Sequence, residues 1–222
     1  MKSTSVFDII GPNMIGPSSS HTAGALRIAL LAGKMTKRPI VKVEFVLYGS
    51  FARTYQGHGT DRALVGGILG FSPEDARIRN SFDIARERGI DFSFRPDYDT
   101  KDVHPNTADV IITDDSGTVS TVRGASIGGG AAVIQQINGV DVKLRGELST
   151  ILVRQKDTPG VLAHIARCLA DNNINIAFTR MYREAKGENA YTIIEADGAI
   201  PAKVLSEIEA LPSILSAILI EL

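Results

Sequence analysis

Alternating hydrophobic and polar residues predict a series of short strands in the first part of the chain. Each run is bounded by glycine, proline, asparagine or aspartate and is rich in valine, isoleucine and threonine. Two pairs of runs flank the turn sequences DDSG, at residues 114–117, and Asn138-Gly139, and both turns are hairpin signals. The predicted strands are residues 41–48, the stretch around Phe92 and Phe94, and residues 108–113, 118–123, 131–137 and 140–144.

Helical periodicity appears between these strands. Leu26, Leu30 and Leu31 have the spacing of a buried helix face, and they follow a Gly/Pro-rich start at residues 16–24. Three further helical segments are expected, and the charged residues of the last one are typical of a solvent-exposed face. These are a helical turn at residues 50–55, an apolar helix at 62–69 and an exposed amphipathic helix at 73–88.

The pattern becomes more compact after Gly146, where we expect a domain boundary. The predicted elements that follow are residues 150–155, 161–170, 175–182, 190–196, 201–211 and 214–222. Their order, βαββαβ, is the ferredoxin-like arrangement of a sheet with two helices on one face. We therefore expect an α+β protein with an N-terminal mixed α/β domain, residues 1–146, and a C-terminal ferredoxin-like domain, residues 147–222.

Composition narrows the class of protein. The 222 residues are 44% hydrophobic and 22% charged, with a net charge of −1, which gives no basic field for nucleic acid and no attraction to a membrane surface. Neither a membrane-spanning run nor a signal-peptide core is expected. With one cysteine, Cys168, the chain can form no internal disulfide and cannot ligate an iron–sulfur cluster alone. A single cysteine is typical of a protein in the reducing cytoplasm. We expect no metal ligands in this chain.

The segment GPSSSHTAG, residues 16–24, carries the densest chemistry. Pro17 fixes the entry to the following helix, and Ser20 is the expected N-cap. Free N–H groups at a helix start, beside hydroxyl groups, suit a carboxylate or phosphate, and His21 adds a proton donor or acceptor. The hydroxyl groups are those of Ser18, Ser19, Ser20 and Thr22. The alternative is a serine-rich loop with a cap and no further role.

Three other segments are candidates for the same site. His58 stands between glycines in GHGTD, residues 57–61, where a second helix is expected to begin with Thr60 or Asp61 as its cap. HPNT, residues 104–107, contains His104, and a role in the site and a structural role in the loop explain this histidine equally well. SIGGG, residues 126–130, can present backbone N–H groups of Gly128 and Gly129 to an anion, although flexible loops look the same. No GxGxxG pattern precedes a βαβ unit, which argues against a dinucleotide.

These segments carry a resemblance that covers essentially the whole chain. DTPGVL, residues 157–162, with NINI, residues 173–176, resembles an ACT domain, a small regulatory module that commonly binds amino acids. The four blocks GPSSSHTAG, GHGTD, HPNT and SIGGG, in this order, resemble the beta chain of the bacterial iron–sulfur L-serine dehydratase. Any one block is weak evidence, but the set is specific.

The resemblance implies the deamination of L-serine to pyruvate and ammonia (EC 4.3.1.17) without pyridoxal phosphate. In the family a 4Fe-4S cluster acts as Lewis acid on the serine hydroxyl while a base removes the α-proton. Because Cys168 is the only cysteine here, the resemblance implies that a partner, the dehydratase alpha chain, ligates the cluster in a two-chain enzyme.

The resemblance also assigns roles to residues. The hydroxyl groups of residues 18–20 and 22 are expected to bind the substrate carboxylate, and Gly128 and Gly129 to shape the site. His58 is the expected base and His21 the second choice.

In the ACT part, the expected ligand residues are Asp157, Pro159, Gly160 and Asn175. Serine-regulated relatives have His and Asn where this chain has Gln155 and Asp157, so the resemblance does not establish serine as the ligand. An acidic Asp157 would repel a carboxylate but could hold an ammonium group. A role in pairing two copies of the chain is an equally good expectation.

A different class of function fits some of the same residues. The front part also resembles the extra substrate-binding domain of some phosphoglycerate dehydrogenases, which is regulatory and not catalytic. In that case the chain would be a serine-sensing regulatory protein whose histidines only bind ligand. GPSSSHT and GHGTD together favour the dehydratase.

Overall fold

The computed structural model describes residues 13–146 and 148–221. The chain forms two compact units that divide between Arg145 and Gly146. Among the described residues, no helix has both the length and the apolar character needed to cross a membrane.

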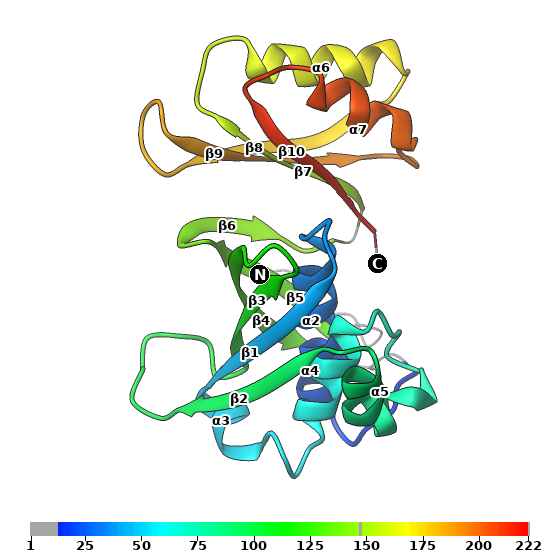
Figure 1. The fold of residues 1–222 in the computed structure, drawn as a ribbon, viewed down its shortest axis with the longest axis vertical. Helices are drawn as coiled ribbons and strands as arrows, with labels where there is room; N and C mark the ends of the chain where they lie inside the picture. The colour runs from blue at the N-terminus through cyan, green and yellow to red at the C-terminus, as the bar shows by residue number, and fades with distance from the viewer. Residues whose placement is uncertain (1–12, 147, 222) are drawn as a thin grey trace, which may run out of the picture. The chain divides into compact units, whose positions relative to one another are not determined.

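The first unit is built on a six-stranded sheet with the order β2-β1-β3-β4-β5-β6 (Figure 1). β1 pairs with β2 in parallel, and each of the other neighbouring pairs is antiparallel. The strands are β1 Ile40–Tyr48, β2 Asp91–Asp97, β3 Thr107–Asp114, β4 Val119–Gly128, β5 Ala131–Ile137 and β6 Val140–Leu144. Asn138 and Gly139 both have positive φ, as the predicted hairpin turn between β5 and β6 requires.

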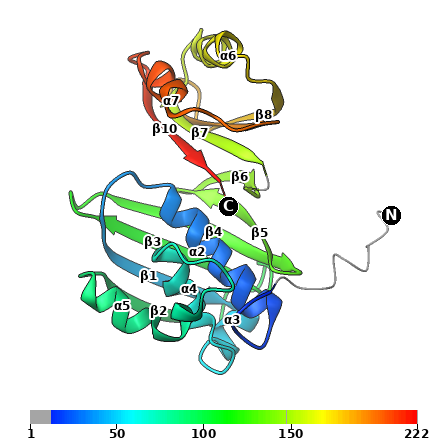
Figure 2. The ribbon, with the colours of Figure 1, turned by 90° about the vertical axis from the view of Figure 1, so that its right-hand side faces the viewer.

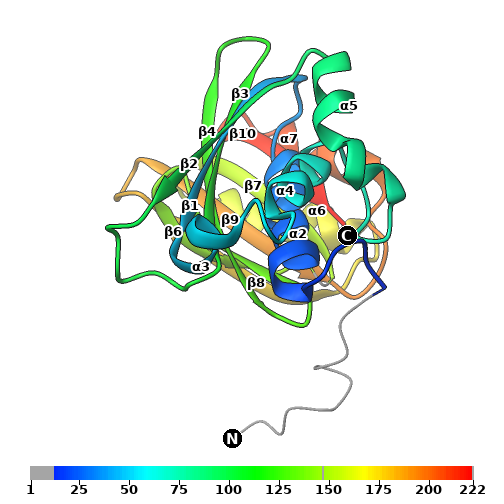
Figure 3. The same cartoon turned by 90° about the horizontal axis from the view of Figure 1, so that it is seen from below.

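Helices cover one face of this sheet (Figures 2 and 3). They are η1 Ser19–Ala23, α2 Gly24–Lys34, α3 Gly49–Thr54, α4 Thr60–Ile68, η2 Ala76–Asn80 and α5 Ser81–Glu87. α2 packs on β4 and β5 through fully buried side chains such as Leu26 and Ile28, and α4 lies beside it. A Cβ at Gly67 of α4 would overlap the Leu26 carbonyl oxygen and lie 2.8 Å from Leu30 N, so only glycine allows this close approach of the two helices.

The starts of two helices differ from the sequence prediction. A π-helical turn, η1, precedes α2, and its N-cap is Ser18, whose Oγ accepts from His21 N, and not Ser20. At α4 the cap position is Gly59, with φ of 70°, and not Thr60 or Asp61. The Gly59 carbonyl accepts the Ala63 N–H at 3.0 Å, so Gly59 caps the helix and Thr60 is the first residue of α4.

Residues 73–88 do not form the single amphipathic helix that their periodicity predicts. Asp75 caps the 3-10 helix η2 by accepting from Arg77 N, and α5 begins only at Ser81. Ser81 is fully buried, and its hydroxyl donates to the Arg62 carbonyl of α4. This tertiary contact sets where the segment breaks, and helical periodicity alone does not reveal it.

The second unit has the predicted ferredoxin-like order βαββαβ. Its elements are β7 Ser149–Lys156, α6 Val161–Asp171, β8 Ile176–Arg183, β9 Asn189–Ala196, α7 Ala202–Glu209 and β10 Ile214–Ile220. The antiparallel sheet has the order β10-β7-β9-β8, and both helices cover one face of it (Figure 1). Ile151 and Val153 of β7, Ile165 and Leu169 of α6 and Ile208 of α7 are buried in its core. The α+β fold class is thus confirmed; Leu222, predicted as the end of the last strand, lies outside the described residues.

Candidate functional site

The two predicted histidines lie side by side in the first unit. The ring centroids of His21, in η1, and His58, in the loop before α4, are 4.7 Å apart, and the rings meet edge to face at 79°. The sequence brings them together because α2 and α4 pack side by side and each histidine stands near the start of one of these helices. Two groups able to carry a proton therefore share one small region.

The HPNT block is bound to the same region through α3. Gly49, which follows the last residue of β1, has φ of 54°, and a Cβ there would lie 2.8 Å from the Cα of Pro105. The N–H groups of Ser50 and Phe51 both donate to the Pro105 carbonyl, at 2.7 and 3.3 Å. This arrangement turns the chain sharply after β1 and places Ser50 Oγ 2.9 Å from His21 Nε2.

The SIGGG block reaches the region through Ser126. Its N–H donates to the Asn106 carbonyl at 2.9 Å, and its side chain is fully buried. A Cβ at Gly24 would overlap Ser126 Oγ and lie 2.7 Å from Ser126 Cβ, so glycine is needed where η1 meets α2. All four motif blocks thus converge on one place in the fold.

His21 is surrounded by hydroxyl groups. Its Nε2 lies 2.9 Å from Ser50 Oγ, and its Nδ1 lies 3.3 Å from both Ser18 Oγ and Ser20 Oγ. The pKa of His21 is lowered from its ordinary value, first by burial of the ring and second by the nearby His58. Neutral His21 is therefore favoured, with hydrogen-bond partners at both ring nitrogens.

His58 has a different environment. Its Nδ1 is buried without a hydrogen-bond partner in the structure, and its backbone N–H donates to the Thr54 carbonyl at 3.0 Å. His58 also lines a cavity of about 350 Å³. The other lining residues are Ile15, Gly16, Pro17, Thr22, Gln56, Gly57, Gly59, Arg62, Ile78 and Arg79. Nδ1 of His58 thus has no partner among the described residues, while the residue as a whole lines the cavity.

Other polar atoms of these blocks also lack partners. The side-chain oxygens of Thr60, Asn106, Thr107 and Ser126 are buried with no hydrogen-bond partner among the described residues. Buried polar atoms are nearly always paired, so such a group near two histidines is typical of a functional site.

The structure places the remaining candidates in different ways. The Thr22 hydroxyl donates to the Ser18 carbonyl within the π-helical turn. Ser19 begins η1, while Gly128, with φ of 101°, ends β4 and Gly129, with φ of 57°, begins the turn that follows. The contacts described above join Ser126, and not these two glycines, to the helix start that bears His21.

Two further residues bear on this site: His104 of the HPNT block, and Ser50, which lies outside the four blocks. The exposed His104 accepts from Asn106 N at its Nδ1, at 3.2 Å, and so fixes its own loop. Ser50 was missed by sequence reasoning. The only signal was its position directly after a strand, at the start of the predicted turn.

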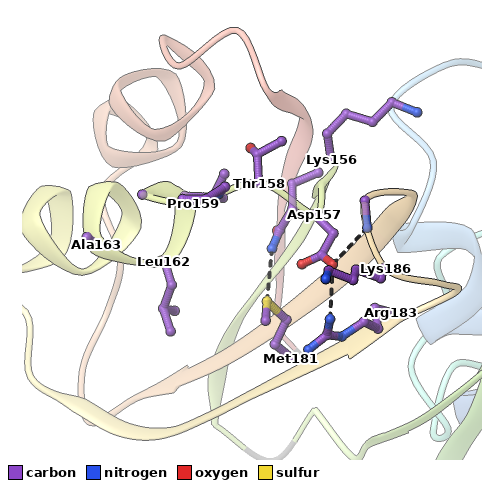
Figure 4. Close-up of a pocket in the computed structure, with 13 residues that line it drawn as sticks. Lys156, Asp157, Thr158, Pro159, Leu162, Ala163, Met181, Arg183 and Lys186 are labelled. Carbon is purple, nitrogen blue, oxygen red and sulfur yellow. Dashed lines mark hydrogen bonds and ion pairs between the residues drawn. The ribbon is translucent and has the colours of Figure 1, made fainter.

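A second candidate site is a cavity of about 440 Å³ in the C-terminal unit, between the start of α6 and the end of β8 (Figure 4). Asp157, Pro159 and Gly160 line it, as expected. Asp157 and Arg183 point toward one another: Asp157 Oδ2 accepts from Arg183 Nη1 at 3.3 Å and from Gly187 N at 3.1 Å. The carboxylate is thus already engaged within the chain.

Gln155, which also lines this cavity, has a buried polar atom without a partner among the described residues. It is 1% exposed, and its Nε2 donates to Thr192 Oγ1 at 2.7 Å, which leaves Oε1 buried and unpartnered. Asn175 is not among the lining residues. It precedes β8, at the opposite end of that strand from Arg183, and its Nδ2 donates to Asp197.

The cysteine does not form part of a metal site in the described residues. Cys168 lies in α6, 8% exposed, where burial raises the pKa of its thiol. Within residues 13–146 and 148–221, no group of three or more His, Cys, Asp or Glu side chains is placed to hold a metal ion. The residues present therefore do not fit ligation of a 4Fe-4S cluster by this chain.

The fold and the converging motif blocks define a two-part protein, a histidine-containing α/β unit followed by an ACT-type unit. Residues 5–137 match the family model of the serine dehydratase beta chain, and residues 149–213 match the ACT domain model. The chain belongs to the serine dehydratase beta chain family and is the beta chain of an L-serine dehydratase, EC 4.3.1.17.

Three relatives illustrate the similarity. A probable L-serine dehydratase beta chain of Bacillus subtilis is 45% identical over 215 residues, 97% of each chain. The L-serine dehydratase beta chain of Peptoniphilus asaccharolyticus is 46% identical over 176 residues, 79% of each chain. A D-3-phosphoglycerate dehydrogenase of Bacillus subtilis is 30% identical over 199 residues, but these are 88% of this chain and only 37% of that enzyme.

Proposed function

We propose that this beta chain supplies the substrate-binding and acid–base residues for the conversion of L-serine to pyruvate and ammonia. The observation that carries the proposal is the His21–His58 pair, with rings 4.7 Å apart where all four motif blocks meet. The enzyme acts in the cytoplasm, whose reducing conditions suit a chain with one cysteine.

His58 is the base in this proposal. Removal of the α-proton of serine needs a neutral side chain that the substrate can reach, and His58 lines the cavity of about 350 Å³. The electron pair of the broken C–H bond forms the double bond to the β-carbon, from which the hydroxyl departs. The resulting aminoacrylate tautomerises and is hydrolysed to pyruvate and ammonia.

The serine hydroxyls bind the substrate, and His21, whose ring nitrogens contact Ser18, Ser20 and Ser50, orients them. The helix start at residues 18–20 offers hydroxyl groups and backbone N–H groups to the substrate carboxylate, and Thr22 supports that turn through its bond to Ser18. Gly128 and Gly129 contribute by shaping the loop after β4.

The partner in this proposal is a dehydratase alpha chain. It would ligate the 4Fe-4S cluster, whose chemistry when bound is Lewis-acid activation of the departing hydroxyl. Because the described part of the beta chain offers no ligand set for a cluster, no step of the beta-chain chemistry depends on cluster ligation here.

The direct test is anaerobic co-expression with a dehydratase alpha chain, followed by an assay for pyruvate from L-serine. Pyruvate formation by the complex, and none by either chain alone, supports the proposal. Tight binding of L-serine by the isolated chain, with no activity in any complex, would instead support the serine-sensing regulatory protein.

We further propose that the C-terminal cavity binds a small regulatory amino acid. Asp157, Pro159 and Gly160 line it, and the carboxylate of Asp157 can accept from an ammonium group. Such a ligand must compete with Arg183 for Asp157. Asn175, outside this cavity, belongs to the site only if a second copy brings it there.

Calorimetric titration of the full chain with a panel of amino acids tests this. Binding that Asp157→Asn abolishes and Asn175→Ala preserves would support the cavity as the site. Heat of binding that persists in Asp157→Asn, or the absence of binding by any amino acid, would refute it.

Pairing of two ACT units is the alternative role. β8 is an edge strand, and its Phe178 and Met181 are 40% and 44% exposed. An uncovered edge with large apolar side chains favours addition of another strand. Sedimentation of the full chain should then show a dimer that Met181→Lys weakens; a monomer at all concentrations would exclude this role.

A further inference from the structure

Ser50 stands outside the four motif blocks, yet its Oγ makes the shortest polar contact of the His21 ring, 2.9 Å from Nε2. We propose that Ser50 is a positioning residue for the dehydration: its hydroxyl holds His21 in the neutral Nε2–H tautomer, so that the ring faces His58 in a fixed orientation. The role in dehydration rests on the function proposed above for the histidine pair, but the hydrogen bond does not.

Two hydroxyl groups lie beside the other ring nitrogen, and they favour one direction for this hydrogen bond. Ser18 Oγ and Ser20 Oγ each lie 3.3 Å from His21 Nδ1, so two hydroxyl protons are available to an Nδ1 that accepts, whereas Ser50 Oγ alone contacts Nε2. We therefore take Nδ1 as the acceptor. In a neutral ring whose Nδ1 accepts, Nε2 carries the hydrogen and donates it to Ser50 Oγ.

The surrounding chain holds Ser50 in place. Gly49 turns the backbone with a positive φ that its contact with Pro105 requires, and the Ser50 N–H donates to the Pro105 carbonyl at 2.7 Å. Thr54 Oγ1 donates to the Ser50 carbonyl at 2.8 Å, within the short helix α3. Because three separate contacts fix its backbone, Ser50 can hold the imidazole at little further entropic cost.

The consequence is a division of roles between the histidines. His21 is hydrogen-bonded at both ring nitrogens and has no free lone pair, whereas His58 Nδ1 has no partner. Ser50 thereby keeps His21 from competing as the base and holds its ring edge to face with His58.

Histidine tautomers can be measured directly on the full chain. In the parent, long-range ¹H–¹⁵N spectra of ¹⁵N-histidine-labelled protein should show the Nε2–H form for His21. In Ser50→Ala, Nε2–H loses its acceptor, so the ratio of Nδ1–H to Nε2–H should rise about fivefold, the factor expected for one ordinary hydrogen bond. Ser50→Thr keeps the hydroxyl and should retain the parent ratio.

Thr54→Ala is the control: it removes one contact of the Ser50 backbone but leaves the Ser50 hydroxyl on His21, so it should change the ratio less than Ser50→Ala does. Three results would each overturn the proposal. They are an unchanged tautomer ratio in Ser50→Ala, an equally large change in Thr54→Ala, and a parent protein whose His21 carries its hydrogen on Nδ1. In the assembled enzyme, Ser50→Ala should lower kcat about tenfold with little change in KM, because orientation matters most in the transition state. The tautomer is measured without turnover, so its result stands even if the dehydratase assay fails.

Discussion

Two side chains of the same chemistry differ here because of their neighbours. His21 has hydroxyl groups at both ring nitrogens and a pKa that burial and His58 lower. His58 lines a cavity and has an unpartnered Nδ1. The environment thus favours one histidine as an oriented neutral group and the other as a proton acceptor.

Substitution of each histidine should separate these roles. In the assembled enzyme, His58→Asn should lower kcat by about 10²–10⁴-fold, the usual contribution of a positioned base, because asparagine cannot accept a proton near neutral pH. His21→Asn should retain more turnover, since an amide can still bond Ser50. The measurement is pyruvate formation at saturating L-serine and matched cluster content.

The reverse result would reassign the base. If His21→Asn loses turnover and His58→Asn keeps it, His21 removes the proton. His58→Ala serves as the control for size: nearly equal losses in the alanine and asparagine variants indicate proton transfer, whereas recovery in asparagine indicates positioning.

The lowered pKa of His21 predicts a pH effect. Because the folded chain protonates His21 less readily than the unfolded chain, the free energy of unfolding should fall as pH drops below the ordinary histidine value of 6.5, and gain nothing from this residue above it. An NMR titration of the full chain should give His21 a pKa below 6.5, and His58→Asn should raise that value by removing one of its two causes. A value above 6.5 in the parent would contradict this expectation.

The neighbouring serines predict two different effects of alanine substitution. Ser20→Ala should mainly raise KM for L-serine, because a carboxylate contact acts in ground state and transition state alike. Ser18→Ala should raise KM and also lower the free energy of unfolding by about 1 kcal/mol, because Ser18 is the N-cap of η1. Steady-state kinetics and urea unfolding distinguish them; unchanged KM in both variants would leave the serines with a structural role only.

At the scale of elements, local patterns predicted which strands and helices form, but they predicted the starts of some helices poorly. The strands at 131–137 and 140–144 have the predicted bounds, because alternation and the Asn138-Gly139 turn are local signals. The π-helical turn at Ser19–Ala23 was not predicted, because the sequence there fits an ordinary capped helix. Ser50 was missed because its contact with His21 joins residues 29 positions apart.

The junction of η1 and α2 gives a prediction at this scale. An alanine at Gly24 would place its Cβ against Ser126 Oγ and Cβ, which are fully buried and cannot move away freely. We expect Gly24→Ala to lower the free energy of unfolding by about 1–3 kcal/mol, as overpacking does, in spite of the higher helix propensity of alanine. Urea unfolding measures this loss.

Ser126→Gly provides the matched test of the cause. The double variant, Gly24→Ala with Ser126→Gly, should recover much of the loss because the overlapping atoms are removed. Additive effects of the two substitutions would show that the contact with Ser126 is not the origin of the requirement for glycine.

At the scale of the whole molecule, the described residues place the histidine pair in the first unit and an ACT-type cavity in the second. Neither offers a set of ligands for a cluster among the described residues. In the function proposed above, the histidine pair accounts for proton transfer but not for activation of a hydroxyl leaving group, which is why the proposed enzyme needs a second chain.

The isolated chain should therefore be colourless and inactive. Cys168 is the only cysteine, it lies in the core of the C-terminal unit, and burial raises the pKa of its thiol, so the thiolate that binds iron is disfavoured. Anaerobic reconstitution of the purified chain with iron and sulfide should give no stoichiometric cluster absorbance, and Cys168→Ser should behave as the parent does. The same treatment with an alpha chain present should give a brown complex that forms pyruvate, and in that complex Cys168→Ser should again change neither iron content nor activity. A brown preparation of the beta chain alone, with stoichiometric iron and sulfide, would contradict the prediction.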